Sequence, residues 1–599
     1  MKEFKTYFRD EEIIRQVCKI RVKLAKSRNK KHLLHLLTSN PKYNYHNNSS
    51  IINNEFQEYQ DNITQELKCI LPPRKKWIKL GSYSRVKNTK SKSKEFLTSN
   101  DKNYYSLIKT IRKHHKQNSK EKWFLNLMDF IKQTKENALS HNYQVNTPII
   151  FPKLKDPKKL PPLSSCETND CRPICMFNLQ DRVILSLTNK FLTRAFDNLF
   201  KDSSYAFRSR KIENKTVSHH NCIQEIITYK KNLKDDFLYV VECDMKKFYD
   251  TVNHKIALNQ FESLIKASKK NNPNIDFSYP IHIFNSYLKS YCFNINVIGI
   301  STPEYWKSYN IDKGQFPWVE EDIKNTYQNL KNERIGVPQG GALSGLIANI
   351  YLNEADEKLE NFKGLYLRFC DDMIIIHNNL EEIQKAKDTY LKTLEELKLF
   401  THPFNDNKLQ KEHGKRISYK PFWKSKSKGP YKWSDEINKG HFPWIAFVGY
   451  HINFKGKLRV RKKSFEKEYQ KQKQIIDEIK KAIEKEHRCK KGTPIESAIN
   501  RLIGMSVGRI ALHNFDEVST DMCWKNGFKE LKINKHSSRQ LKDLDRNRSK
   551  LYYDLIKQIN ELFENEESDP LNSSKKREMI NYDKPFSYYY QVLERSKKS

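Results

Sequence analysis

Three aspartates at the ends of short apolar segments are the strongest candidates for chemistry in this sequence. Asp371 and Asp372 stand together in LYLRFCDDMIIIH, and Asp244 follows the apolar run FLYVVEC. A charged pair between two β-prone runs is typical of a hairpin, in which Asp can simply serve the turn geometry. Carboxylates from separate segments can instead hold two divalent cations ~4 Å apart, as phosphoryl transfer requires. The fold must decide between these interpretations.

The segments around these aspartates predict a mixed sheet. Strand-like and helical runs alternate between 237 and 378, which is typical of a sheet with helices on one face. Asp244 would emerge at the C-terminal edge of a buried strand, where open sheets place their sites, or would cap the helix that follows. The intervening IGVPQGGALSGLIANIY has glycines and Pro338 before a helix that begins near 342, and it is neither a P-loop nor a dinucleotide fingerprint.

Charge and composition restrict the partners. The 599 residues carry a formal net charge of +39, which attracts polyanions, so nucleic acid is the leading partner and an anionic membrane surface the alternative. No stretch approaches the ~20 apolar residues of a membrane span, and the start lacks the apolar core of a signal peptide. We therefore expect a soluble, cytoplasmic protein without membrane association. Cys166, Cys171 and Cys175 raise a zinc alternative, but their spacing is not that of a standard finger.

The rest of the chain predicts helical flanks. Residues 1 to about 140 are rich in Lys, Asn and Gln, with apolar residues at helical spacing from Ile108 to Ile131. After 460 an amphipathic helix is expected, with one apolar stripe that consists of Ile475, Ile479, Ala482 and Ile483. A near-repeat, KGQFPW at 313–318 and KGHFPW at 439–444, has no assigned function.

The order of the central motifs resembles the palm of reverse transcriptases: strand–Asp, then PQGGxLS–helix, then an aromatic–x–Asp–Asp hairpin. RPICMFNLQDRVI looks like the fingers motif of that family, and AFVGYHINFKGKLRVRKKS resembles its primer grip, with Phe447, Gly449 and Tyr450 at the turn. The resemblance implies an α+β fold, a right-hand polymerase with fingers and palm, a helical thumb and basic helical extensions. The implied domains are 1–146 (N-terminal extension), 147–460 (fingers and palm), 461–530 (thumb) and 531–599 (C-terminal extension).

The resemblance also implies a catalytic site. Asp244, Asp371 and Asp372 would be catalytic and would bind two Mg²⁺ ions. Tyr249 matches the bulky residue that blocks a ribose 2′-OH and so favours deoxynucleotides. Gln339 corresponds to the glutamine near the nucleotide sugar and base.

Four basic residues receive roles from the same similarity. Arg172 would contact the incoming triphosphate, and Arg182 would support the fingers. Lys408 matches a lysine near the phosphates. Arg208, in SYAFRSRK, would lie along the template or primer.

The implied activity is RNA-directed DNA polymerisation, with dNTPs as substrates, an RNA template and a DNA product. The region after 515 contains Cys523 and His536 without the paired ligands of an intron-type endonuclease portion, and insertions near 301–330 and 415–445 depart from a compact enzyme. These features favour the defence-associated, unknown-group reverse transcriptases, which resemble group II intron and retron enzymes and act in antiphage immunity with a non-coding RNA.

Two alternatives stay open: a group II intron-type reverse transcriptase or maturase, and a non-catalytic RNA-binding scaffold that keeps the palm. Priming by a protein hydroxyl is a further option, because the terminal segment offers Tyr582, Tyr588, Tyr589 and Tyr590. More often such a cluster packs its rings against the fold. A homo-oligomer or a partner protein is compatible with the sequence.

Overall fold

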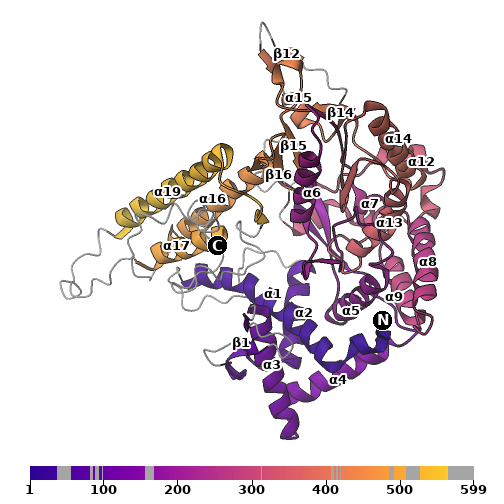
Figure 1. Ribbon diagram of the computed structural model, residues 1–599. Coiled ribbons are helices and arrows are strands. Elements are labelled where there is room, and N and C mark those ends of the chain that lie inside the picture. Colours follow the sequence, from indigo (N-terminus) through magenta and orange to yellow (C-terminus); the bar gives the residue numbers. More distant parts are fainter. Residues whose placement is uncertain are drawn as a thin grey trace. The chain divides into compact units, whose positions relative to one another are not determined.

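The structure is a computed structural model that describes residues 1–36, 55–80, 85–87, 94–96, 99–155, 168–309, 311, 313–405, 410–412, 416–418, 420–484, 492–507 and 527–563 (Figure 1). The chain divides into two compact units. The first comprises Met1–Lys23, Ser49–Ser218 and Leu238–Tyr431, and the second Leu24–Asn48, His219–Phe237 and Lys432–Ser599. The expected mixed fold of helices and strands is confirmed. The units interleave along the chain, whereas the predicted domains are consecutive, so their boundaries stay predictions.

The largest sheet of the first unit has five strands in the order β11-β14-β7-β10-β9. Their bounds are Phe404–Asn405 (β11), Ser427–Trp433 (β14), Leu238–Cys243 (β7), Asp372–His377 (β10) and Leu365–Phe369 (β9). β10 is antiparallel to both neighbours, β7 and β9. Because β7 ends where β10 begins, the three candidate aspartates lie at the same end of two adjacent strands.

Apolar side chains explain why β7 and β10 are central. Met373 to Ile376 are all buried, and so are most residues of β7, which is the pattern of strands covered on both faces. Helix α14 (Leu380–Glu396) packs on both strands, and α13 (Ser344–Lys358) packs on α14 and on α8 (His254–Asn271). The helix that the sequence predicts near 342 is α13.

A second sheet of the first unit has the order β3-β4-β8. Its strands are Ile149–Leu154 (β3), Asn169–Met176 (β4) and Gly314–Gln315 (β8). Helix α5 (Leu179–Phe196) follows β4, and its N-cap Asn178 accepts a hydrogen bond from the Asp181 amide. The Cys175 amide donates to the Gln339 carbonyl at 2.8 Å, so β4 is joined directly to the PQGG segment.

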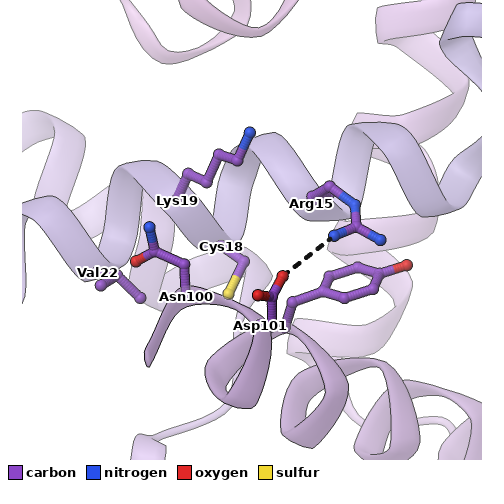
Figure 2. A pocket seen from close by; sticks show the side chains of 7 residues that line it. Arg15, Cys18, Lys19, Val22, Asn100 and Asp101 are labelled. Carbon is purple, nitrogen blue, oxygen red and sulfur yellow. Dashed lines mark ion pairs between the residues drawn. The ribbon is translucent and has the colours of Figure 1, made fainter. Parts of the chain in front are cut away.

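The predicted helical region from Ile108 to Ile131 consists of two helices. They are α3 (Ser99–Lys116) and α4 (Lys122–Ala138), and the intervening turn contains Asn118 with a positive φ of 45°. Helix α1 (Asp10–Leu36) and α3 line a small pocket with Cys18 and Lys19 on one helix and Asn100 and Asp101 on the other (Figure 2). Its volume of about 20 Å³ holds roughly one water molecule.

The second unit contains a helical bundle. Helices α16 (Lys462–Glu484), α17 (Gly492–Val507) and α19 (Lys535–Phe563) lie side by side and share one apolar core (Figure 1). Ile479 and Ile483 of the predicted stripe are buried there, and Ile475 packs against the core. The side chain of Ala482 lies outside the described residues. A sheet of three strands, β15 (Trp444–Phe447), β16 (Tyr450–Asn453) and β17 (Leu458–Val460), precedes the bundle.

The remaining helices and strands complete the two units. They are η1 Phe4–Phe8, α2 Glu55–Ile70, η2 Arg74–Lys76, β1 Arg85–Lys87, β2 Lys94–Phe96, β5 Lys211–Ile212, β6 Lys215–Thr216, α6 His219–Asn232, α7 Phe248–Thr251, α9 Ser278–Lys289, η3 Phe293–Val297, α10 Ile298–Ile300, α11 Pro303–Ser308, α12 Glu320–Thr326, η4 Leu330–Asn332, β12 Gln410–Glu412, β13 Arg416–Ser418, α15 Lys420–Lys424 and η5 Ile437–Lys439. Within the described ranges, none of the helices has the length and apolar character needed to cross a membrane.

Candidate active site

Asp244 directly follows β7, as the sequence predicts, and its backbone is held on both sides. Its amide donates to Ser427 Oγ at 3.1 Å, and its carbonyl accepts the His402 amide at 3.0 Å. The side chain is 33% exposed, and Lys426 Nζ lies 3.9 Å from Asp244 Oδ2. The carboxylate is therefore accessible to a ligand while the main chain is fixed.

Asp371 lies in a two-residue turn between β9 and β10. Phe369 pairs with Asp372, so Cys370 and Asp371 form the loop, and Cys370 has a positive φ of 61°. Such tight hairpins need a left-handed residue to match the strand twist. The turn is also held from inside, because Arg368 Nη1 donates to the Cys370 carbonyl at 3.0 Å. Asp371 is half-buried, and Asp372 is exposed at the start of β10.

The pairing of β7 with β10 brings the aspartates together. Met373 pairs with Cys243, so Asp244 and Asp372 are the next positions on two adjacent strands. Burial raises the pKa of Asp371, and the negative charge of Asp244 raises it further, whereas the Arg172 guanidinium lowers it. Asp244 and Asp371 are thus close enough to repel each other. In the described part of the chain, no three Asp, Glu, His or Cys side chains converge tightly enough to hold a metal ion.

A group of cations lies beside the aspartates. Arg172 is exposed on β4, and its charge acts on both Asp371 and Asp250. Lys247 adopts a left-handed conformation, with φ 53° and ψ 42°. Burial lowers the pKa of Lys247 to about 7, and the neighbouring ammonium of Lys155 lowers it as well. Three positive charges gathered beside the aspartates form a suitable environment for a polyphosphate.

Sequence analysis did not single out Lys155 or Lys247. Lys155 directly follows β3, and Lys247 belongs to the run DMKKFYD that follows Asp244. For Lys247, the position just after the predicted strand that ends at Asp244 was therefore an available signal. That the two ammonium groups meet depends on the contact between separate sheets, which no local pattern indicates.

Gln339 is oriented by a buried carboxylate that sequence analysis also missed. Its Nε2 donates to Asp250 Oδ1 at 2.7 Å. Asp250 is only 3% exposed, and burial raises its pKa to about 6, although Gln339 and nearby cations, Lys247 among them, act in the opposite direction. The amide of Gln339 is consequently fixed next to the cation group.

Tyr249 lies against the aspartate turn. Its hydroxyl is 3.1 Å from Cys370 Sγ, and its carbonyl accepts the Val337 amide at 2.8 Å. Burial raises the pKa of Tyr249, so the phenol stays neutral. The ring is thus located beside Asp371, where a bulky residue could limit the size of a bound sugar, and the predicted gate stays a prediction.

The structure does not support the expectation that Arg208 lies along a template or primer. Its side chain is 1% exposed and pairs with Asp197 at 2.8 Å. Its remaining donors are directed at the carbonyls of Lys201, Ser204, Asp197 and Phe200. Because these internal acceptors satisfy the guanidinium, Arg208 stabilises the fold and is not exposed to a nucleic acid. Arg182, by contrast, is half-buried on α5, and its support of the fingers stays a prediction.

The predicted primer-grip residues belong to the second unit. Val448 and Gly449 form the two-residue turn between β15 and β16, both with positive φ, which matches a type I′ turn. Tyr450 is fully buried, and its hydroxyl lies 2.9 Å from His220 Nδ1. A direct contact between the Tyr450 ring and nucleic acid is therefore not supported, whereas the turn itself is partly exposed.

Several predicted features fall outside the described residues. They are Lys408, Cys166 and the terminal tyrosines Tyr582, Tyr588, Tyr589 and Tyr590. Cys171 and Cys175 of the zinc alternative are both buried in β4. Burial raises the pKa of the Cys171 thiol to about 11.

The region from residue 155 to residue 438 is similar to a known protein family. Residues 155–438 match the family described as reverse transcriptase (RNA-dependent DNA polymerase). The "Putative COX1/OXI3 intron 1 protein" of Saccharomyces cerevisiae is 22% identical over 225 residues, which covers 37% of this chain and 19% of that protein. The chain thus matches about a fifth of this curated relative.

Solved telomerase structures show a weaker similarity. Apo telomerase from Candida tropicalis is 13% identical, with 81% of this chain and 78% of that chain covered and a TM-score of 0.33. Telomerase from Candida albicans in complex with a TWJ fragment of telomeric RNA is also 13% identical, with 80% and 69% covered and a TM-score of 0.30. The family match includes Asp244, Asp371 and the cation group, so residues 155–438 carry a reverse transcriptase domain.

Proposed function

We propose that this protein is an RNA-directed DNA polymerase whose active site contains Asp244, Asp371 and Asp372. The observation that carries the proposal is the placement of Asp244 and Asp371 at the same end of the adjacent strands β7 and β10, with the Arg172 guanidinium near enough to act on Asp371. An acidic pair beside a cationic group suits a substrate that brings both a polyphosphate and divalent metal ions. The match to the reverse transcriptase family supports the same activity.

The donor set fits Mg²⁺. Asp244 and Asp371 offer only oxygen ligands, and their mutual repulsion is what a bound cation would relieve. Among the described residues Asp372, at the start of β10, does not close a three-carboxylate group with Asp244 and Asp371, so the phosphates of the substrate would supply the further oxygen ligands. When bound, two Mg²⁺ ions would supply activation of the primer 3′-OH and charge neutralisation at the leaving pyrophosphate.

The protein's own residues would bind and orient the nucleotide. Arg172, Lys155 and Lys247 would contact the triphosphate, because their positive charges lie together beside Asp371. Gln339, fixed by Asp250, would face the sugar and base. Tyr249, held against Cys370, would exclude a ribose 2′-OH.

Primer extension tests this proposal. The wild-type chain should add labelled dNTPs to a DNA primer on an RNA template with Mg²⁺, and Asp371→Asn should abolish addition because one metal ligand loses its charge. RNA affinity should be unchanged, since binding depends on Lys and Arg. Asp388→Asn, on the exposed surface of α14, is the matched control and should keep full activity. Full activity of Asp371→Asn would contradict the assignment of the site.

We further propose that the template is a non-coding RNA and that the product acts in antiphage defence in the cytoplasm. The net charge of +39 supports a stable complex with RNA, and the insertions at 301–330 and 415–445 support a type other than compact intron or retron enzymes. Sequencing of the RNA and DNA that co-purify with the protein should return one RNA and a complementary DNA. Phage plating on cells that carry wild-type or Asp371→Asn protein then tests the defence role, and equal plaque numbers would exclude it.

A further inference from the structure

Residues 313–322, within the insertion near 301–330, contact three elements around the proposed nucleotide site: β4, α7 and the segment directly after Asp244. This segment includes the motif KGQFPW, strand β8 and the start of α12. All of its contacts discussed here lie within the first compact unit. We refer to residues 313–322 as the brace segment.

The first contact joins the brace segment to β4. Gly314 and Gln315 pair in parallel with Asn169 and Asp170, and the Asn169 amide donates to the Lys313 carbonyl at 3.0 Å. Gln315 Nε2 then donates to Asp170 Oδ1 at 2.7 Å.

Asp170 connects the brace segment to the cation group. Its second oxygen, Oδ2, lies 3.9 Å from Lys155 Nζ, and its carbonyl accepts the Lys155 amide at 2.9 Å. Asp170 also acts electrostatically on Lys247. Arg172 lies two positions further along β4 and on the same exposed face. Gln315 therefore fixes the carboxylate that organises these cations.

The second contact joins the brace segment to α7. Trp318 Nε1 donates to the Asp250 carbonyl at 3.2 Å, and the indole packs on Phe293 with ring centroids 5.1 Å apart. The carboxylate of Asp250 accepts the Gln339 amide, so Trp318 holds the main chain of the residue that orients Gln339. Gly336 leaves room for this arrangement, since a Cβ there would lie 2.6 Å from Phe293 Cβ.

The third contact reaches the segment directly after Asp244. Both carboxylate oxygens of Asp322 accept from Lys246 Nζ, at 3.2 and 3.0 Å. Lys246 is 25% exposed at the side chain and Asp322 34%, so the pair is partly shielded from solvent. One short segment thus holds β4, the 244–246 stretch and α7 at once.

We propose that the brace segment positions the nucleotide-binding groups, so that Gln315 and Trp318 determine the affinity for the incoming dNTP. The inference rests on the proposed polymerase function and concerns residues that do not touch the substrate. Without the contacts of the brace segment, one fewer connection joins β4, which contains Asp170 and Arg172, to α7, which contains Asp250. The cations would then sample more arrangements, and binding of the triphosphate would have to order them.

The packing of the segment argues against a plain surface loop. A Cβ on Gly314 would lie 2.0 Å from the indole of Trp306, which is 5% exposed, so the strand is in direct contact with a buried ring. Lys313, before it, has a positive φ of 47°. A loop with no positional role would have no need for this close approach.

The test measures nucleotide affinity and turnover separately. Gln315→Ala and Trp318→Phe each remove one donor, and Trp318→Phe keeps an aromatic ring against Phe293. Each should raise the KM for dNTP about tenfold, the scale of a lost hydrogen bond to a charged or buried group, with kcat changed less than about twofold. Lys324→Ala, which removes the exposed pair with Glu320 on the same insertion, is the matched control and should change neither constant.

A second measurement avoids turnover altogether. Titration of dNTP into the full-length protein bound to RNA and a chain-terminated primer should show the same loss of affinity. In a double-mutant cycle, Gln315→Glu should weaken dNTP binding through repulsion from Asp170. Adding Asp170→Asn should recover part of the loss, because a donor again faces an acceptor.

The outcomes separate the two proposals. An inactive wild-type protein would refute the polymerase function, whereas an active one with normal KM and dNTP affinity in both Gln315→Ala and Trp318→Phe would refute the brace. If Gln315→Ala does not fold, the dNTP affinity of Trp318→Phe and the double-mutant cycle of Gln315→Glu with Asp170→Asn test the proposal. No recovery in that cycle would also count against the brace, since its main hydrogen bond would then have no effect on the site.

Discussion

The buried ion pair between Arg368 and Asp356 supports the turn that contains Asp371, so its removal should affect stability and activity in separable ways. Both side chains are fully buried, with Arg368 Nε 2.8 Å from Asp356 Oδ1 and Nη2 2.5 Å from Oδ2. Nη1 of the same guanidinium holds the Cys370 carbonyl at 3.0 Å. Arg368→Met leaves Asp356 buried without its partner, which costs about 3–5 kcal/mol.

This loss should be large in a melting experiment. The first unit has about 390 residues, for which the unfolding entropy gives a shift of roughly 1.2 °C per kcal/mol, so the first unfolding transition should fall by about 4–6 °C. Lys201→Met breaks a similar ion pair with Glu360 that is exposed, with Lys201 at 29% and Glu360 at 54%, so it should cost below about 1 kcal/mol.

A double variant separates the two effects. Arg368→Met with Asp356→Leu removes both charges and should recover most of the stability, because apolar replacements of a buried pair are often neutral. The Cys370 carbonyl still lacks its donor, so primer extension should stay reduced. A melting change below about 2 °C in Arg368→Met would refute the energetic reasoning. Full activity of the double variant would refute the link between Arg368 and the turn.

Three further predictions concern Lys247, Tyr249 and Arg208. Because the pKa of Lys247 lies near 7, its charge is lost as pH rises above that value, so the KM for dNTP should increase between about pH 7 and 9. Lys247→Arg should flatten this profile, and a profile unchanged by the substitution would remove Lys247 from the site. Tyr249→Ala should increase ribonucleotide incorporation. Tyr249→Phe, which loses only the contact with Cys370, should keep the discrimination between deoxyribose and ribose. Equal discrimination by the wild type and both variants would contradict the role of Tyr249 as a gate. Arg208→Met should lower stability by about 3–5 kcal/mol through the unpaired Asp197 and leave the salt dependence of RNA binding unchanged; a reduced salt slope would restore Arg208 as a nucleic-acid contact.

Local sequence patterns were sufficient to predict the strands and the helix around the aspartates. Short apolar runs predicted β7 and the β9–β10 hairpin, and the glycines with Pro338 predicted the helix after PQGG. The structure has each of them. These predictions succeeded because burial on both faces of a central strand requires a continuous apolar run, which is visible in the sequence. The stripe of α16 was equally visible, since Ile479 and Ile483 recur at helical spacing.

The family resemblance misjudged Arg208, because a motif records residue type and position but not solvent exposure. A short basic motif looks the same whether its guanidinium faces a phosphate or the Asp197 carboxylate inside the fold. Tyr450 is a similar case, since it was expected to bind nucleic acid at the primer-grip turn and its ring is fully buried. Both outcomes depend on which backbone carbonyls and side chains surround the residue after folding.

The sequence by itself determined the order of motifs, the net charge and the identity of the candidate acidic residues. Only the tertiary structure decided that Asp244 and Asp371 repel each other, that Lys155 meets Lys247, and that residues 313–322 tie β4 to α7. The physical reason is the range of the interactions involved. Strand and helix periodicities are set by neighbours along the chain. Charge interactions and hydrogen bonds between sheets are set by distances in space, which depend on how separate elements pack.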